Sequence, residues 1–273
     1  TLLEEIRHIE RSIVLVQDYH LSLVPALIKK SRPDAQVAMF WHIPWPSAAQ
    51  FNICPWREEI LGGMLGADLV GFHTQQYCNN FMETVGNEVE SRIDSEHFSV
   101  FRNAHRTFVR PFPISIAYPG NAESGEAPNR GVLDTLGIRS KHLILGVDRL
   151  DYIKGIPERF KGFEFLLDAR PEYRGTTTLL QIGSPTRESV GMFREYAERV
   201  VAESERINEK FGTADWRPIV LERRSYSHTE LRNLYQLADV CLVTSLHDGM
   251  NLVAKEYAAA RSDESGVLVL SQF

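Results

Sequence analysis

The chain has 273 residues, is 43% hydrophobic and carries a formal net charge of −6. This length and apolar fraction suffice for one large domain or two smaller ones, each with its own core. The negative charge, without any run rich in lysine or arginine, argues against a nucleic-acid-binding protein. No apolar run approaches the roughly 18 residues that a membrane span needs.

The number and spacing of the cysteines indicate the redox environment in which the protein works. Cys54, Cys78 and Cys241 are scattered and show no C-x-x-C spacing. An odd, scattered set disfavours a disulfide framework and a zinc site, and it favours a reducing cytoplasm. The chain opens on TLLEEIRHIE without a methionine and stops on the strand-like GVLVLSQF, so we expect a fragment.

Short apolar runs alternate with longer amphipathic stretches along the chain. The apolar runs predict strands at 12–17, 36–41, 68–72, 141–147, 177–183, 217–222, 239–245 and 266–270. The amphipathic stretches predict helices at 19–31, 56–65, 74–90, 155–170, 187–211, 228–237 and 250–261. This alternation predicts parallel sheets with helices on both faces, and continuously apolar strands are typical of such sheets.

Two stretches depart from the alternation. Residues 91–113 contain the strand-like FSVF and TFVRPF and predict a β insertion. Residues 116–130, rich in Pro, Gly, Ser and Asn, predict a linker. We therefore expect an α/β protein with two Rossmann-like, doubly wound domains at 1–120 and 121–273, the first truncated at its start and the second at its end.

Ligands of open α/β sheets bind beyond the carboxyl ends of the strands, so the residues that follow each strand are candidates for a site. Four strand ends are dense in polar residues: 17–20, 42–46, 148–155 and 247–251. In the third, Arg149 and Lys154 precede a predicted helix whose dipole favours anions. They fit a diphosphate clamp, and they fit equally well surface cations paired with Asp148 and Asp151.

The stretch SLHDGMNLVAKEYAAAR places polar residues before the last predicted helix. Gly249 permits close approach of a ligand, and the first N–H groups of the helix, from Met250 to Val253, form an anion site. The strongest alternative makes Asp248 a simple N-cap. Glu256 lies further into the helix, where it could bind sugar hydroxyls or remain a solvated carboxylate.

The first half of the chain offers further candidates. His42 follows a strand in FWHIPWP, where two prolines fix the loop, and Asp18 ends the neighbouring strand. Arg187 starts a helix after another strand. Trp45 could stack on a sugar, although packing is the commoner role for tryptophan. No G-x-G-x-x-G, no P-loop and no Asp-x-Asp pair is present, so we expect neither a cofactor nor a metal.

Taken together, QDYHLSLVP, FWHIPWPS, GVDRLDYIKGIPERF, ADVCLVTSLHDGMNLVAKEYAAAR and GVLVLSQF resemble the trehalose-6-phosphate synthase family. These are retaining glycosyltransferases of the two-Rossmann-domain (GT-B) fold. The resemblance implies transfer of glucose from a nucleotide-glucose, UDP-glucose before others, to glucose 6-phosphate, without metal. The partners it implies are therefore a nucleotide-sugar donor and a sugar-phosphate acceptor, and a homo-oligomer stays open.

The resemblance also assigns roles to the candidates. Arg149 and Lys154 would hold the diphosphate and Glu256 the ribose, while the backbone near Tyr226 would meet the base. Asp18 and Arg187 would face the acceptor, with Arg187 on its phosphate. The helix start that caps the diphosphate comprises Asn251, Leu252, Val253 and Ala254. The residues that contact the transferred glucose are His42, Asp248, Gly249 and Met250. The catalytic set it implies is His42, Arg149, Lys154 and Asp248.

Some motifs depart from the family pattern. The chain has QDYHL, HIPWP and LHDGM where the family often has HDYHL, HTPFP and LRDGM, so His247 replaces a cation. The family also begins with a strand and a glycine-rich loop, which are absent here, and it continues beyond Phe273. These changes leave two alternatives open. One is a glucosylglycerol-phosphate synthase that uses glycerol 3-phosphate, and the other is a non-catalytic regulatory subunit of the same fold.

Overall fold

The structure of the chain is a computed structural model, and it describes residues 1–117, 127–186, 189–261 and 263–272. The chain divides into two compact units, Thr1–Ile114 and Ser115–Phe273. The predicted domain boundary after residue 120 lies among residues that the structure does not describe. No helix in the described part of the chain is long and apolar enough to cross a membrane.

Unit 1 is built on a six-stranded sheet in the order β1-β2-β3-β6-β5-β4. The pairs β1–β2, β2–β3 and β3–β6 are parallel, and the pairs β4–β5 and β5–β6 are antiparallel. The strands are β1 (Ile13–Gln17), β2 (Gln36–Phe40), β3 (Leu69–Phe72), β4 (Arg92–Asp94), β5 (Ser99–Arg102) and β6 (His105–Pro111). The helices are α1 (Leu2–Glu5), η1 (Tyr19–Leu21), α2 (Val24–Ser31), α3 (Ala48–Phe51), α4 (Arg57–Met64) and α5 (Gln75–Glu88).

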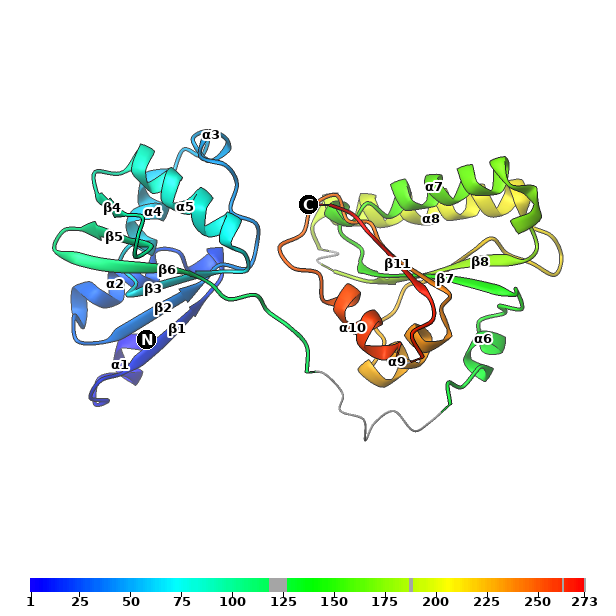
Figure 1. Cartoon of the computed structure of the whole chain (residues 1–273), viewed down its shortest axis with the longest axis horizontal. Coiled ribbons are helices and arrows are strands. Elements are labelled where there is room, and N and C mark those ends of the chain that lie inside the picture. The colour runs from blue at the N-terminus through cyan, green and yellow to red at the C-terminus, as the bar shows by residue number, and fades with distance from the viewer. Residues whose placement is uncertain (118–126, 187–188, 262, 273) are drawn as a thin grey trace. The chain divides into compact units, whose positions relative to one another are not determined.

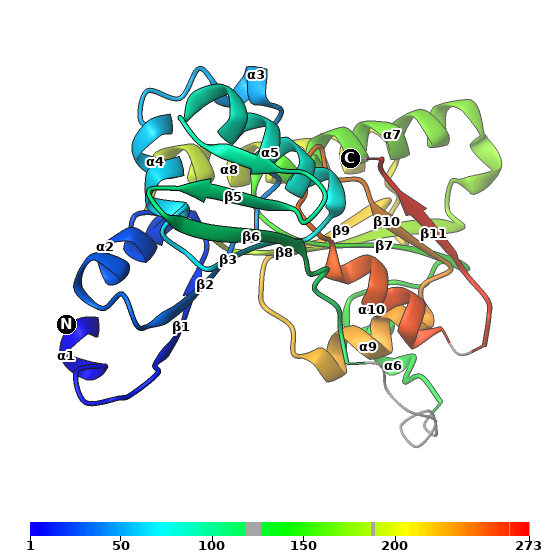
Figure 2. The ribbon, with the colours of Figure 1, turned by 60° about the vertical axis from the view of Figure 1, so that its left-hand side comes forward.

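Burial in unit 1 corrects one expectation from the sequence. Val14 and Val16 of β1 are buried in the core with residues of α4 and α5, which Figure 2 shows above β3 and β6. The alternate residues Ile13 and Leu15 are 76% and 62% exposed. The strand predicted as continuously buried therefore alternates. A run of four apolar residues fits a strand buried on both faces and a strand buried on one face, so the sequence alone could not separate the two.

Unit 2 contains a five-stranded, fully parallel sheet in the order β11-β10-β7-β8-β9. The strands are β7 (His142–Arg149), β8 (Thr177–Ser184), β9 (Ile219–Glu222), β10 (Val240–Val243) and β11 (Val267–Leu270). The helices are α6 (Gly131–Thr135), η3 (Tyr152–Lys154), α7 (Ile156–Ala169), η4 (Pro171–Tyr173), α8 (Gly191–Phe211), α9 (His228–Leu237) and α10 (Leu252–Ala260). Helices α7 and α8 lie on one face of the sheet, and α9 and α10 lie on the other (Figure 1).

Each face of this sheet has its own apolar core. Phe160, Phe163 and Val200 belong to the core beneath α7 and α8, whereas Leu234 and Tyr257 belong to the core beneath α9 and α10. Burial on both faces explains why β7 and β8 read as nearly unbroken apolar runs. The doubly wound class expected from the sequence is confirmed here, and the carboxyl ends of β7 and β10 meet at one edge of the sheet.

Most long elements begin and end within a few residues of their predicted positions. The predicted helix 19–31 is instead divided into η1 and α2, because Pro25 occupies the first turn of α2. The short α3 was missed, although Ser47 and Gln50 form the capping box that marks its start.

Candidate functional site

The loops that follow β7 and β10 meet in unit 2. The N–H of Leu246 donates to the carbonyl of Ile153 at 2.7 Å, which ties the two loops together. Lys154 Nζ donates to Asp248 Oδ2 at 2.6 Å, and both side chains are largely buried, at 11% and 14% exposed. Two residues 94 positions apart therefore form one cation–carboxylate pair beside the end of β7.

Arg149, the last residue of β7, has an exposed side chain. Within the described residues its guanidinium makes no ion pair and no side-chain hydrogen bond. Asp148 is instead paired with Arg159, and Asp151 accepts from the N–H of Ile153 at 3.2 Å. The alternative that pairs Arg149 and Lys154 with Asp148 and Asp151 is therefore wrong, because both carboxylates are committed elsewhere.

Asp148 and Arg159 form a buried ion pair beneath these loops. The Nη1 of Arg159 donates to Asp148 Oδ2 at 2.6 Å, and the two side chains are 1% and 3% exposed. The same guanidinium donates to Gln181 on β8 and to Thr244 at the end of β10. This network ties β7, β8 and the residue after β10 together, and the sequence did not predict it, because PERF reads as an ordinary helical stretch.

The helix α10 is capped by Asn251, not by Asp248. Asn251 Oδ1 accepts from the N–H of Ala254 at 3.0 Å, and its Nδ2 donates to Asp248 Oδ2 at 3.0 Å. The N-cap alternative for Asp248 is therefore wrong. The cap also engages the N–H of Ala254, whose place among the anion-binding donors stays a prediction. Leu252 and Val253 keep N–H groups that have no acceptor within the helix.

The surroundings of Asp248 keep its carboxylate charged. Burial acts to raise the pKa of Asp248, but the hydrogen bond and positive charge of Lys154, with smaller contributions from Asn251 and Gly249, hold that pKa below its usual value. Gly249 and Met250 are half-buried in the same turn, next to Asp248. The loop thus presents one carboxylate that is already oriented by three donors.

Glu256 and Tyr226 lie further along unit 2. The hydroxyl of Tyr235 donates to Glu256 Oε2 at 2.9 Å, which joins α9 to α10. Tyr226 lies between β9 and α9, where its hydroxyl donates to Glu222 Oε2 at 3.1 Å and the guanidinium of Arg224 stacks over its ring at 3.6 Å. Burial, followed by the charge of Glu222, raises the pKa of Tyr226 to about 12.

Unit 1 brings Asp18 and His42 together at the carboxyl ends of β1 and β2. The N–H of His42 donates to Asp18 Oδ1 at 3.2 Å, and His42 Nε2 lies 2.7 Å from Gln17 Oε1. Asp18 has φ 65° and ψ 171°, a region that is essentially reserved for glycine. Such strain costs about 1–3 kcal/mol and is concentrated at functional sites. Glycine is the residue that usually indicates such a conformation in a sequence, so an aspartate at this position did not predict it.

Two further candidates have different outcomes. Trp45 is buried, donates from Nε1 to Thr84 Oγ1 at 3.0 Å and stacks on Phe51, so it packs the core. Arg187 lies outside the described residues.

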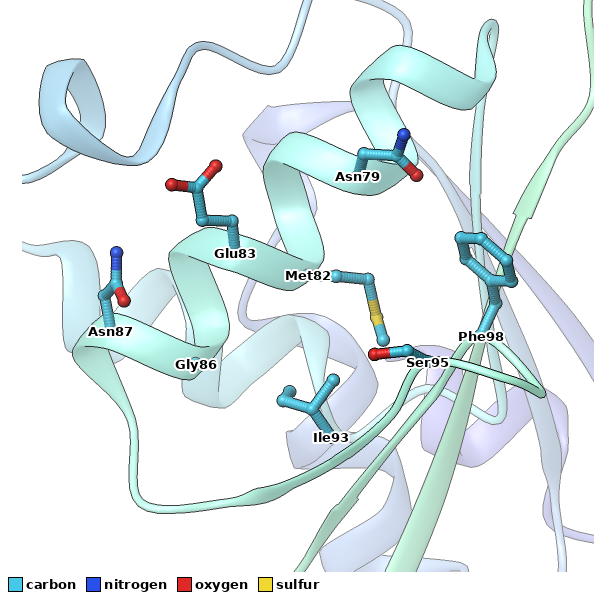
Figure 3. A pocket seen from close by; sticks show the side chains of 8 residues that line it. All are labelled: Asn79, Met82, Glu83, Gly86, Asn87, Ile93, Ser95 and Phe98. Carbon is cyan, nitrogen blue, oxygen red and sulfur yellow. The ribbon is translucent and has the colours of Figure 1, made fainter.

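A groove of about 470 Å³ lies on unit 1 between α5 and the segment that leads from β4 to β5 (Figure 3). Met82 forms its floor, with Ile93 and Phe98 beside it, and Asn79, Glu83 and Asn87 line its α5 side (Figure 3). None of the predicted site residues lines this groove. Among the described residues, no group of three or more His, Cys, Asp or Glu side chains could hold a metal ion.

Two α/β units with polar residues at the carboxyl ends of their strands are the architecture expected of the GT-B fold. The family model of glycosyltransferase family 20 matches residues 1–273. The chain belongs to glycosyltransferase family 20.

Relatives with the same sequence pattern are trehalose-phosphate synthases. The chain is 37% identical over 282 residues to the UDP-forming alpha,alpha-trehalose-phosphate synthase of Pichia angusta. The alignment covers 100% of this chain and 58% of that protein. The chain thus spans less than two thirds of the length of this relative.

Solved structures agree with this relationship. A UDP-forming alpha,alpha-trehalose-phosphate synthase from Burkholderia xenovorans, in complex with glucose-6-phosphate, matches at TM-score 0.91 with 33% identity, covering 100% of this chain and 62% of that one. A structure from E. coli bound with UDP-2-fluoro glucose matches at TM-score 0.91 with 32% identity, covering 100% and 61%. These matches confirm the expected fold class.

Proposed function

We propose that the protein is a retaining glucosyltransferase that moves glucose from UDP-glucose to glucose 6-phosphate and forms trehalose 6-phosphate. The observation that carries this proposal is the cluster at the ends of β7 and β10. There an exposed Arg149, the Lys154–Asp248 pair and the start of α10 adjoin. The relative from Pichia angusta is named UDP-forming, which supports the choice of nucleotide.

The donor half of the site lies in unit 2. Arg149 supplies a planar guanidinium for a diphosphate, and the first N–H groups of α10, at Leu252 and Val253, supply neutral donors. Lys154 adds a second charge next to Asp248. Glu256 receives the ribose, the backbone at Tyr226 meets the base, and Asp248, Gly249 and Met250 contact the glucose.

The acceptor half involves unit 1. Asp18 offers a carboxylate that suits the hydroxyl groups of the acceptor. Its neighbour His42, whose N–H donates to this carboxylate, is the residue assigned to the transferred glucose. The Burkholderia xenovorans structure contains glucose-6-phosphate, which supports a sugar-phosphate acceptor. Arg187, which lies outside the described residues, is the residue assigned to the acceptor phosphate.

The proposed reaction needs little from the protein beyond positioning and charge stabilisation. The bond from glucose C1 to the donor phosphate oxygen breaks, and a bond from C1 to the acceptor oxygen forms on the same face. The proton of the acceptor hydroxyl passes to the leaving phosphate. Arg149 and Lys154 stabilise the negative charge that develops on UDP, which is commonly the largest catalytic contribution.

A transfer assay with radiolabelled UDP-glucose tests the proposal in the natural protein. We expect a labelled disaccharide phosphate with glucose 6-phosphate, and no product with unphosphorylated glucose. A product formed only with glycerol 3-phosphate would identify a glucosylglycerol-phosphate synthase instead. Binding of UDP without turnover on either acceptor would identify a regulatory subunit.

The proposal includes a location and a set of partners. Three free cysteines, two of them buried, support a reducing cytoplasm. Burial raises the pKa of Cys78 to about 11 and that of Cys241 to about 12, so neither is a reactive thiolate at neutral pH. The partners are the nucleotide-sugar donor and the sugar-phosphate acceptor.

A further inference from the structure

We infer that Tyr235 is a positioning residue that presents the carboxylate of Glu256 to the ribose of the donor nucleotide. This inference rests on the proposed donor site and adds a residue that does not itself touch the ligand. Its starting observation is the hydrogen bond from the Tyr235 hydroxyl to Glu256 Oε2 at 2.9 Å. An ionised carboxylate only accepts hydrogen bonds, so the phenol is the donor.

Tyr235 is held rigidly at both ends. Its ring is 2% exposed and lies edge-to-face with Tyr257, with ring centres 6.3 Å apart. Arg261 Nη1 donates to the carbonyls of Tyr235, Gln236 and Ala238, which fastens the last turn of α9 to the end of α10. The phenolic oxygen therefore has a fixed position relative to the helix that carries Glu256.

The protonation state of Tyr235 is equally fixed. Burial, followed by the negative charge of Glu256, raises the pKa of Tyr235. The hydroxyl therefore keeps its proton near neutral pH and can donate to Glu256. The geometry and the raised pKa both support this donor–acceptor pair.

The hydrogen bond to Oε2 of Glu256 also restricts the position of the other carboxylate oxygen, Oε1. A free glutamate side chain loses up to about 2 kcal/mol of rotamer entropy when a ligand immobilises it. With Oε2 held by Tyr235, the half-buried Glu256 has already lost much of that freedom, and Oε1 can accept from a ribose hydroxyl. Preorganisation of this kind increases affinity by reducing the cost of binding.

A purely structural explanation makes a different prediction. A buried phenol requires a hydrogen-bond partner, and Glu256 could serve only that need. In that case the loss of either partner would change stability but not the recognition of ribose. The two explanations therefore differ in whether Tyr235 and Glu256 affect the preference for a nucleotide with ribose hydroxyls.

Calorimetry with UDP and with 2′,3′-dideoxy-UDP provides the test. We expect the wild-type chain to prefer UDP by about tenfold or more, as for a hydroxyl bonded to a carboxylate. Glu256→Ala should abolish this preference, and Tyr235→Phe should reduce it by about threefold or more. The control Tyr257→Phe, which removes a neighbouring buried hydroxyl bonded to the Ala238 carbonyl, should leave the preference unchanged.

The preference is a ratio of two affinities measured on one sample, so any unfolded fraction cancels. Tyr235→Phe combined with Glu256→Ala should show no loss beyond Glu256→Ala alone, because both changes act on one contact. A full preference in Tyr235→Phe, with loss in Glu256→Ala, would overturn the inference and leave the ribose assignment intact. No preference in the wild type would overturn the ribose assignment, and the inference with it.

Discussion

The carboxyl ends of the two sheets are built in different ways. In unit 2 the cluster around Lys154 and Asp248 is stabilised by ion pairs, a capped helix and a buried Arg159 network. In unit 1 the cluster of Asp18 and His42 has no ion pair among the described residues. His42 packs against Phe40 and His73, and the backbone at Asp18 is strained. The first arrangement suits a highly charged ligand and the second suits neutral hydroxyl groups.

This difference has a physical basis. A diphosphate is bound by full charges and helix N–H groups, which must be oriented in advance to be effective in a partly buried site. Recognition of hydroxyls depends instead on the exact direction of a few acceptors, and backbone strain is one way to fix such a direction. We therefore expect changes in unit 2 to weaken nucleotide binding, and changes in unit 1 to affect transfer alone.

The largest effect is expected from Arg149→Ala. Removal of one charge-assisted donor from the developing phosphate charge should lower kcat/KM by roughly a hundredfold, about 3 kcal/mol. Steady-state kinetics with UDP-glucose on the natural protein measures this, and UDP affinity should fall as well. The control is Arg139→Ala, an exposed arginine of the same unit. Wild-type turnover in Arg149→Ala would refute the diphosphate clamp.

A smaller effect is expected at Gly155, which links Lys154 to α7 with φ +60°. A Cβ there would lie 3.1 Å from Leu246 Cγ and 3.2 Å from the Thr244 carbonyl oxygen. Gly155→Ala should destabilise unit 2 by roughly 1–2 kcal/mol and weaken UDP binding. Gly162→Ala, inside α7 with no atom within 4 Å of the new Cβ, should stabilise it by roughly 0.5–1 kcal/mol. Urea unfolding compares them, and equal destabilisation would contradict the account.

Asp18→Gly should separate stability from function in unit 1. Glycine adopts φ 65° and ψ 171° without strain, so the free energy of unfolding should rise by about 1 kcal/mol despite the entropy cost of glycine. UDP affinity should stay at the wild-type value while transfer to glucose 6-phosphate falls at least tenfold, as for a lost charged hydrogen bond. Reduced stability would show that the Asp18 conformation carries no strain, and a parallel loss of UDP binding would erase the distinction between the units.

No effect is expected from a chelator. Arg149, Lys154 and the start of α10 can neutralise a diphosphate without a metal ion. Transfer should therefore continue at its full rate in EDTA. A loss of activity that magnesium restores would show that the charges of unit 2 are insufficient.

The sequence predicted the elements of unit 2 well because their periodicity is long and regular. It also placed Arg149, Lys154, Asp248 and Asn251 near one another, since parallel strands end at one edge of a sheet. It did not predict which carboxylate pairs with which cation, because such pairs depend on side-chain positions in three dimensions. Asp148 pairs with Arg159 and Asp248 with Lys154, which neither spacing nor composition indicates.

Other features were hidden for different reasons. Tyr235 occupies an apolar position of an amphipathic helix, so its ring is explained by packing and its hydroxyl attracts no attention. The N-cap of α10 was assigned to Asp248 as the leading alternative, but Asn251 is an equally good capping residue and lies directly before the helix. Asp and Asn are about equally favourable N-cap residues, so the local sequence does not choose between them, and tertiary contacts determine which one caps the helix.

The central claim is that the loops after β7 and β10 hold the diphosphate of a nucleotide, and a crystal structure of the chain with UDP tests it most directly. The account predicts the diphosphate about 3 Å from the Arg149 guanidinium and from the N–H groups of Leu252 and Val253, at hydrogen-bonding distance. It also predicts Glu256 beside the ribose. A diphosphate bound elsewhere, for instance in the groove along α5, with Arg149 left in solvent, would contradict the account.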